Sequence, residues 1–315
     1  MADFWGFFMR ITVMGSGGVG GYFGARLAQS GCDVTFVARG AHLAAMREHG
    51  LRVQSPLGDI HLAQPRVTEH AAQAGSADLV LFGVKLWDTV AAARAIKPLL
   101  GLESAVVSFQ NSVVKDDLLR QELGDAAVAG GACYISATIA EPGLISHIGT
   151  MAKLAFGEFD GSASPRLTRF GQACTAAGIA HELSPQIRQL EWEKFVFLVG
   201  LSAITAAARL PIGAIRSNPR SRALLQDLME EVAAVARAEG IALAPDFVAR
   251  RVAFADSLPA AMRASMAHDL ERGQRLELPW LSGDVVARGQ RLGVATPCNR
   301  VIVDLLSPFS EGRPA

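Results

Sequence analysis

The chain has 315 residues, of which 50% are hydrophobic and 19% are charged. This composition excludes a largely disordered protein, and the length is sufficient for two domains. The 30 basic and 30 acidic residues cancel, so the charge favours neither a nucleic-acid partner nor binding to a membrane surface.

The cysteines and histidines indicate a reduced, metal-free chain. The four cysteines are far apart and form no C-x-x-C pair, and the seven histidines are scattered. We therefore expect free thiols in a cytoplasmic protein and no metal site.

Two apolar segments are too short for a membrane. Residues 1–9 form a tail without the basic start of a signal peptide. The longest apolar stretch, Phe195–Ala208, is also shorter than a bilayer span, and we interpret it as a buried core helix.

Strands and helices alternate in the first part of the chain. The predicted strands are Arg10–Met14, Asp33–Ala38, Ala77–Val84, Ala105–Phe109 and Ala126–Ala132, with a hairpin of Leu51–Gln54 and Ile60–Ala63. The predicted helices extend from the first glycine-rich turn to Gln29, then over Thr89–Leu99 and Lys115–Leu123. Two further strands, Leu144–His147 and Lys153–Gly157, precede a helix over Arg166–Ala177. This order predicts an α/β fold with a doubly wound, mostly parallel sheet.

After Pro185 the pattern predicts helices only. They are Glu191–Arg209, Arg220–Glu239, Pro245–Ala255, Leu276–Leu292 and Arg300–Leu306. We therefore expect an α/β domain over residues 1–185 and an all-helical domain over 186–315. The final helices are compatible with a homodimer, although no feature of the sequence demands one.

A glycine-rich turn follows the first strand and opens a helix. Its six residues match G-x-G-x-x-G: Gly15, Ser16, Gly17, Gly18, Val19 and Gly20. The first glycine permits the tight turn, the second lets the backbone approach a pyrophosphate, and the third lets the helix pack on the strand. The helix N-terminus then offers N–H groups to the anion. Together with the second strand, this turn predicts a dinucleotide-binding domain of the Rossmann type.

The residue after the second strand predicts which nucleotide binds. Proteins that bind NAD usually place an acidic residue there to accept a hydrogen bond from the ribose 2′-OH. This chain has Arg39, with no acid beside it in the sequence. Because a guanidinium matches a 2′-phosphate bidentately, NADPH is the expected cofactor.

Further polar residues stand where ligands usually bind. Lys85 and Asn111 each follow the carboxyl end of a predicted strand. Lys194 opens the apolar helix, and Leu198 and Ser202 share its helical face at i+4 and i+8. A desolvated lysine can act as an acid or base near neutral pH.

Taken together, these residues resemble the ketopantoate reductases (2-dehydropantoate 2-reductases) from Arg10 to about Leu306. The segments that carry the resemblance are MGSGGVGGYFGARLAQSG, DVTFVARG, VKLWDT, FQNS, EPGLISHIGT, WEKF, RASMAHDLERGQRLELPWLSG and GVATPCN. The resemblance implies an oxidoreductase of pantothenate biosynthesis that passes a hydride from NADPH to the C2 ketone of a 2-oxo acid. It also implies that the substrate lies in a cleft between the two domains.

The resemblance implies a role for each candidate residue. Lys194 would be the general acid, Glu277 would hold a substrate hydroxyl and help to set the lysine, and Ser265 would contact the substrate carboxylate. Lys85 and Asn111 would lie where cofactor and substrate meet, and Ala137 along the nicotinamide.

Two departures from the family pattern concern the substrate. The family usually has asparagines four and eight residues after the lysine, where this chain has Leu198 and Ser202. The usual Asn-Gly pair is Asn111-Ser112 here. Losing a group that bonds a substrate hydroxyl changes substrate preference, so a more apolar 2-oxo acid or another carbonyl compound stays open beside ketopantoate.

Two other functions stay open. A β-hydroxyacid dehydrogenase or imine reductase also pairs a dinucleotide domain with helices, but its usual G-x-x-G-x-x-x-K segment is absent. A non-catalytic NADP-sensing protein would need the glycine turn but neither Lys194 nor Glu277.

Overall fold

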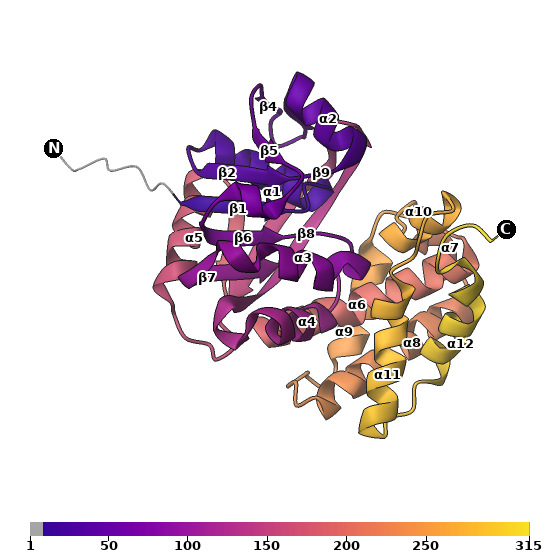
Figure 1. The fold of residues 1–315 in the computed structure, drawn as a ribbon. Coiled ribbons are helices and arrows are strands. Elements are labelled where there is room, and N and C mark those ends of the chain that lie inside the picture. Colours follow the sequence, from indigo (N-terminus) through magenta and orange to yellow (C-terminus); the bar gives the residue numbers. More distant parts are fainter. Residues whose placement is uncertain (1–8, 315) are drawn as a thin grey trace. The chain divides into compact units, whose positions relative to one another are not determined.

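The structure is a computed structural model that describes residues 9–314. The tail predicted for residues 1–9 lies outside the described residues except for Met9. The chain divides into two compact units (Figure 1). The first comprises 9–110 and 115–187, and the second comprises 111–114 and 188–314. Residues 111–114, which the sequence pattern places in the first domain, therefore group with the helical unit.

The first unit is built on one sheet with the strand order β4-β3-β9-β8-β7-β6-β1-β2-β5, and β10 pairs with β9. The strands are β1 Arg10–Met14, β2 Asp33–Val37, β3 Leu51–Gln54, β4 Ile60–Leu62, β5 Arg66–Thr68, β6 Ala77–Phe82, β7 Leu100–Ser108, β8 Val128–Glu141, β9 Leu144–Gly157 and β10 Ala180–Leu183. From β8 through β5 every pairing is parallel, whereas β8–β9 and β3–β4 are antiparallel. The predicted doubly wound, mostly parallel sheet is confirmed.

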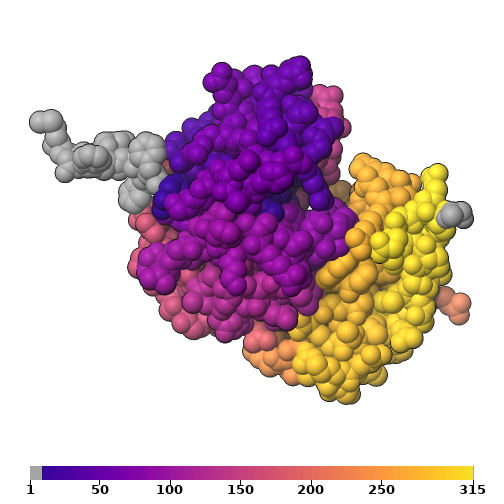
Figure 2. All heavy atoms as spheres, viewed as in Figure 1, coloured from indigo at the N-terminus to yellow at the C-terminus, as the bar shows by residue number. Residues whose placement is uncertain are grey.

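Helices cover both faces of this sheet. The helices of the first unit are α1 Gly18–Gln29, α2 Gly40–His49, α3 Thr89–Ile96, α4 Val114–Leu123 and α5 Pro165–Ala176, with short 3-10 turns η1 Ala71–Ala74, η2 Leu86–Asp88, η3 Lys97–Leu99 and η4 Asp125–Ala127. Along β6, Leu79 and Leu81 pack with α1 and α5, while Val80 and Phe82 pack with α3 and α4. A strand that is covered on both faces has a continuous apolar sequence, as β6 does. In Figure 2 the atoms of this unit, coloured from indigo to pink, pack together.

Several predicted elements need correction. The two strands predicted at Leu144–His147 and Lys153–Gly157 are one strand, β9, because β8 pairs along both parts. The helix predicted over Leu276–Leu292 begins only at Ser282, after the 3-10 turn η5 Leu278–Trp280. Pro279 in that turn favours such a break. Four short elements have no strong periodicity and were not predicted: β5, β10, α7 Ile212–Ser217 and α10 Ser265–Glu271.

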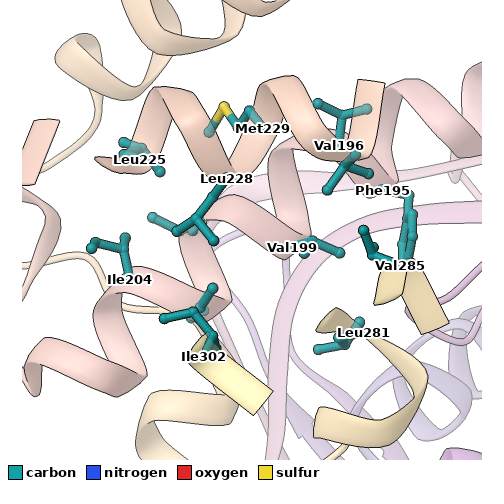
Figure 3. Close-up of a cluster of buried hydrophobic side chains, with 14 of the residues drawn as sticks. Phe195, Val196, Val199, Ile204, Leu225, Leu228, Met229, Leu281, Val285 and Ile302 are labelled. Atoms are coloured by element: carbon teal, nitrogen blue, oxygen red, sulfur yellow. The ribbon is translucent and has the colours of Figure 1, made fainter. Parts of the chain in front are cut away.

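The second unit is helical, as predicted, and has its own core. Its remaining elements are α6 Ile187–Ala208, α8 Pro219–Ala238, α9 Phe247–Ser257, α11 Ser282–Leu292, α12 Pro297–Leu306 and η6 Ser307–Phe309. Side chains from α6, α8, α11 and α12 meet in one apolar cluster (Figure 3). Val196 and Val199 of α6 are fully buried there with Leu228 of α8. Among residues 9–314, no helix combines the length and apolar content needed to cross a bilayer.

Candidate active site

The glycine turn joins the end of β1 to the start of α1. Gly15 has φ +99°, and a Cβ on it would lie 2.7 Å from the Val84 nitrogen, so only glycine fits. The amides of Gly15 and Ser16 both donate to the Val37 carbonyl, at 3.3 and 3.2 Å. The turn is therefore held between the carboxyl ends of β2 and β6.

The remaining glycines of the turn differ in the space around them. A Cβ on Gly18 would lie 2.1 Å from the Ala137 carbonyl oxygen, and one on Gly20 would lie 2.2 Å from that of Gly15. A Cβ on Gly17 would meet nothing within 4 Å. The turn is thus tightly packed at Gly18 and Gly20 and open at Gly17.

This arrangement fits a nucleotide pyrophosphate. The open side of the turn lies at the N-terminus of α1, whose first turn contains no acidic residue. Ser16 is buried, and its hydroxyl donates to the Val37 carbonyl at 3.0 Å, while half-buried Val19 packs against the apolar core. The side chains of Ser16 and Val19 therefore hold the turn, and the backbone is what remains to meet an anion.

Histidine 42 also holds the glycine turn. Its Nδ1 accepts from the Gly143 amide at 3.0 Å, which places the proton on Nε2, 2.9 Å from the Ser16 carbonyl oxygen. Burial lowers the pKa of His42 below its usual value and so favours this neutral form. His42 therefore connects α2 and the β8–β9 turn to the glycine turn.

Arg39 lies directly before α2, at the carboxyl end of β2. Its side chain is 75% exposed and forms an ion pair with Asp88, with Nη2 and Oδ2 2.6 Å apart. Although the sequence shows no acid beside Arg39, the fold thus provides one. Lys85 precedes η2, and its Nζ lies 5.5 Å from the centre of the Trp87 ring.

In the second unit, Lys194 is half-buried on α6, and its Nζ donates to Asn111 Oδ1 at 2.8 Å. The next residue, Ser112, is buried and donates through its hydroxyl to the Trp280 carbonyl at 2.9 Å. Residues 111 and 112 therefore connect the lysine helix to the turn that follows Glu277.

The other candidates of this unit have different surroundings. Leu198 is partly buried against the helical core, and Ser202 is only 1% exposed. The Ser202 hydroxyl has no hydrogen-bond partner among the described residues. Glu277 is half-buried between Leu276 and Leu278, and its carbonyl accepts from the Trp280 amide at 3.0 Å.

Ser265 is exposed and begins α10. The Ala264 amide before it donates to Thr205 Oγ1 at 3.4 Å, which connects this helix start to α6.

Four residues that organise these sites are not among the site residues predicted from the sequence: His42, Asp88, Gln110 and Ser112. Gln110 donates through Nε2 to the Val84 carbonyl at 2.8 Å and to Thr89 Oγ1 at 2.9 Å. Asp88 and Gln110 lie within three residues of Lys85 and Asn111. Their position after a strand could therefore have identified them as candidates. For His42 and Ser112, no local pattern indicates the distant backbone groups that they contact.

Two family models match most of the chain. The model for "Ketopantoate reductase PanE/ApbA" matches residues 11–161, and that for its C-terminal part matches residues 186–310. A 2-dehydropantoate 2-reductase of Halobacterium salinarum is 32% identical over 304 residues, which cover 95% of this chain and 98% of that protein.

Solved structures agree with these matches. A PanE/ApbA family ketopantoate reductase from Ralstonia eutropha superimposes with a TM-score of 0.88 at 34% identity, covering 96% of this chain and 98% of that one. A D-mandelate dehydrogenase bound to NADH and anilino(oxo)acetate gives a TM-score of 0.87 at 20% identity, covering 96% and 98% of the two chains, a likeness that shows the fold alone.

With the glycine turn on one unit, the lysine helix on the other and these matches over both, the chain belongs to the ketopantoate reductase family of pyridine-nucleotide-dependent oxidoreductases.

Proposed function

We propose that the protein is an NADPH-dependent reductase that converts the C2 ketone of a 2-oxo acid into a hydroxyl group, with Lys194 as the general acid. The observation that carries this proposal is the hydrogen bond from Lys194 Nζ to Asn111 Oδ1 at 2.8 Å. An amide oxygen is neutral and can only accept. It therefore orients the ammonium while leaving the positive charge that a developing alkoxide requires.

The glycine turn, Arg39, Lys85 and Ala137 are the residues that would hold the nucleotide. When bound, the nicotinamide would supply the hydride for C2 of the substrate, and the negative charge would develop on the ketone oxygen. Lys194 would give a proton to that oxygen and regain one from solvent. The proposed roles of Glu277 and Ser265 are to hold the substrate hydroxyl and carboxylate, and Asn111 keeps the lysine oriented.

The substrate proposal rests on α6. Leu198 offers an apolar side chain on the helical face of Lys194, and Ser202, with its buried hydroxyl, lies on the same face. This face favours a 2-oxo acid with an apolar side chain over ketopantoate, whose side chain ends in a hydroxyl.

A substrate panel tests the activity. NADPH oxidation would be followed with ketopantoate, 3-methyl-2-oxobutanoate, phenylglyoxylate and pyruvate. We expect turnover of at least one 2-oxo acid, with 3-methyl-2-oxobutanoate or phenylglyoxylate preferred over ketopantoate. Absence of turnover with every 2-oxo acid would contradict the reductase and favour the NADP-sensing alternative.

The role of Lys194 needs its own variant. Lys194→Ala should lower kcat by about 10²–10⁴-fold, the range for loss of general-acid catalysis, with little change in NADPH affinity. Lys97→Ala is the matched control, because Lys97 is exposed on the first unit and its Nζ donates to the Glu122 carbonyl. Turnover like that of the wild type in Lys194→Ala would remove the lysine from the mechanism.

A further inference from the structure

We propose that Asp88 is a specificity-determining residue for the nucleotide, because its carboxylate competes with the 2′-phosphate for the Arg39 guanidinium. The inference deepens the proposed function and rests on NADPH being the cofactor. It starts from the ion pair between Arg39 Nη2 and Asp88 Oδ2, which are 2.6 Å apart.

The strand order shows where this ion pair lies. Arg39 follows β2, and Asp88 ends η2, which follows β6. In the sheet β1 lies between β2 and β6, and neighbouring strands are about 4.8 Å apart. The Arg39 side chain therefore reaches across the carboxyl end of β1, where the glycine turn begins. Ligands of open α/β sheets bind in the crevice at this edge.

The two partners of the ion pair differ in how far they are exposed and held in place. The Asp88 side chain is 27% exposed and lies at the start of α3, where its amide donates to the Lys85 carbonyl at 2.9 Å. A carboxylate at a helix N-terminus is favoured by the helix dipole. Arg39 is 75% exposed, so Arg39 is the partner that moves.

Competition follows from the chemistry of the two anions. An exposed Arg–Asp pair is weak, and a phosphate with two negative charges accepts from a guanidinium bidentately. NADPH can therefore exchange Asp88 for its own phosphate, at the cost of breaking the ion pair. NADH has no 2′-phosphate and leaves Arg39 on Asp88. Asp88 thus lowers the affinity for NADPH without changing that for NADH.

Dissociation constants for NADPH and NADH would be measured by calorimetry for the wild type, Asp88→Asn, Arg39→Ala and the double variant. Asp88→Asn should tighten NADPH binding about two- to fivefold, the upper part of the range for loss of an exposed ion pair, and change NADH binding less than twofold. In the Arg39→Ala background the same substitution should change NADPH binding less than twofold.

Asp125→Asn is the matched control. Asp125 is 76% exposed and forms an ion pair of 2.8 Å with Arg120. It lies directly before β8, at the edge of the sheet opposite the glycine turn. It should leave both dissociation constants unchanged. Circular dichroism would confirm that Asp88→Asn folds, and asparagine remains a favourable residue at a helix start.

The outcomes separate the two proposals. If Asp88→Asn leaves NADPH binding unchanged, weakens it, or tightens NADH equally, the competition is refuted while NADPH preference stands. If the wild type binds NADPH no more tightly than NADH and Arg39→Ala changes neither, the proposed cofactor itself is wrong.

Discussion

At the scale of single residues, polar partners rather than isolated side chains define the sites. Lys194 is oriented by Asn111, and Arg39 by Asp88, each through a side chain distant in the sequence. Ser202 differs, because its hydroxyl is buried without a hydrogen-bond partner among residues 9–314. An unsatisfied buried hydroxyl is costly, and a ligand group can relieve that cost.

The substrate preference can be tested at Leu198. Leu198→Asn should raise the ratio of kcat/KM for ketopantoate over 3-methyl-2-oxobutanoate by about tenfold or more, because an amide can bond the substrate hydroxyl. Leu198→Met keeps the volume and the apolar character and serves as control. An unchanged ratio in Leu198→Asn would show that this residue does not set the preference.

His42 predicts a dependence of stability on pH. Burial lowers its pKa in the folded state, so the unfolded chain takes up a proton first as the pH falls below about 6.5. The free energy of unfolding should therefore decrease as the pH falls from neutrality through the folded-state pKa. In His42→Asn this decrease should be smaller in urea titrations at pH 7.5 and 5.5. Identical decreases in both proteins would contradict the assignment.

At the scale of elements, two glycines of the β1–turn–α1 unit have different roles, one in packing and one, as we propose, in binding. Gly20 is required by packing, because its Cβ would overlap the Gly15 carbonyl. Gly17 has ordinary backbone angles of φ −75° and ψ −159° and open space around it. The structure therefore gives Gly17 no packing reason to be glycine, whereas a bound pyrophosphate would supply one.

A pair of variants tests this distinction. Gly17→Ala should leave the free energy of unfolding nearly unchanged but weaken NADPH binding by on the order of tenfold or more, because the new methyl group would occupy the anion position. Gly20→Ala should lower the free energy of unfolding by about 1–3 kcal/mol through overpacking. Nucleotide titration and urea unfolding of both variants would test these roles. A lower free energy of unfolding in Gly17→Ala would refute the role of Gly17 in binding alone.

At the scale of the whole molecule, the chain forms two units with separate apolar cores. The glycine turn, Arg39, Lys85 and Ala137, which we propose to hold the nucleotide, are in the first unit, and Lys194 with Asn111 is in the second. Separate cores allow the two units to open independently, so a ligand of one unit need not stabilise the other.

Hydrogen exchange can test this independence. NADPH at 100 times its Kd should raise the opening free energy of β1 and β6 by up to about 2.7 kcal/mol. The amides of α8, in the core of the second unit, should change little. Equal protection of both units would show that they unfold together.

Much of the fold could be predicted because its signals are local. Strands such as β6 and helices such as α8 have long apolar patterns that identify them wherever they lie. The single strand β9 and the start of α11 at Ser282 could not be predicted. Pairing with β8 makes β9 one strand, and the 3-10 turn η5 delays the start of α11.

The sequence by itself determined the doubly wound fold, the helical second part and the nucleotide class, because a strand, a glycine turn and a helix are contiguous. Only the tertiary structure decided which partners these residues have. Arg39 and Asp88 are 49 residues apart, Asn111 and Lys194 are 83 apart, and His42 and Gly143 are 101 apart. No local pattern specifies such contacts, because they form only when the sheet and the helices bring distant segments together.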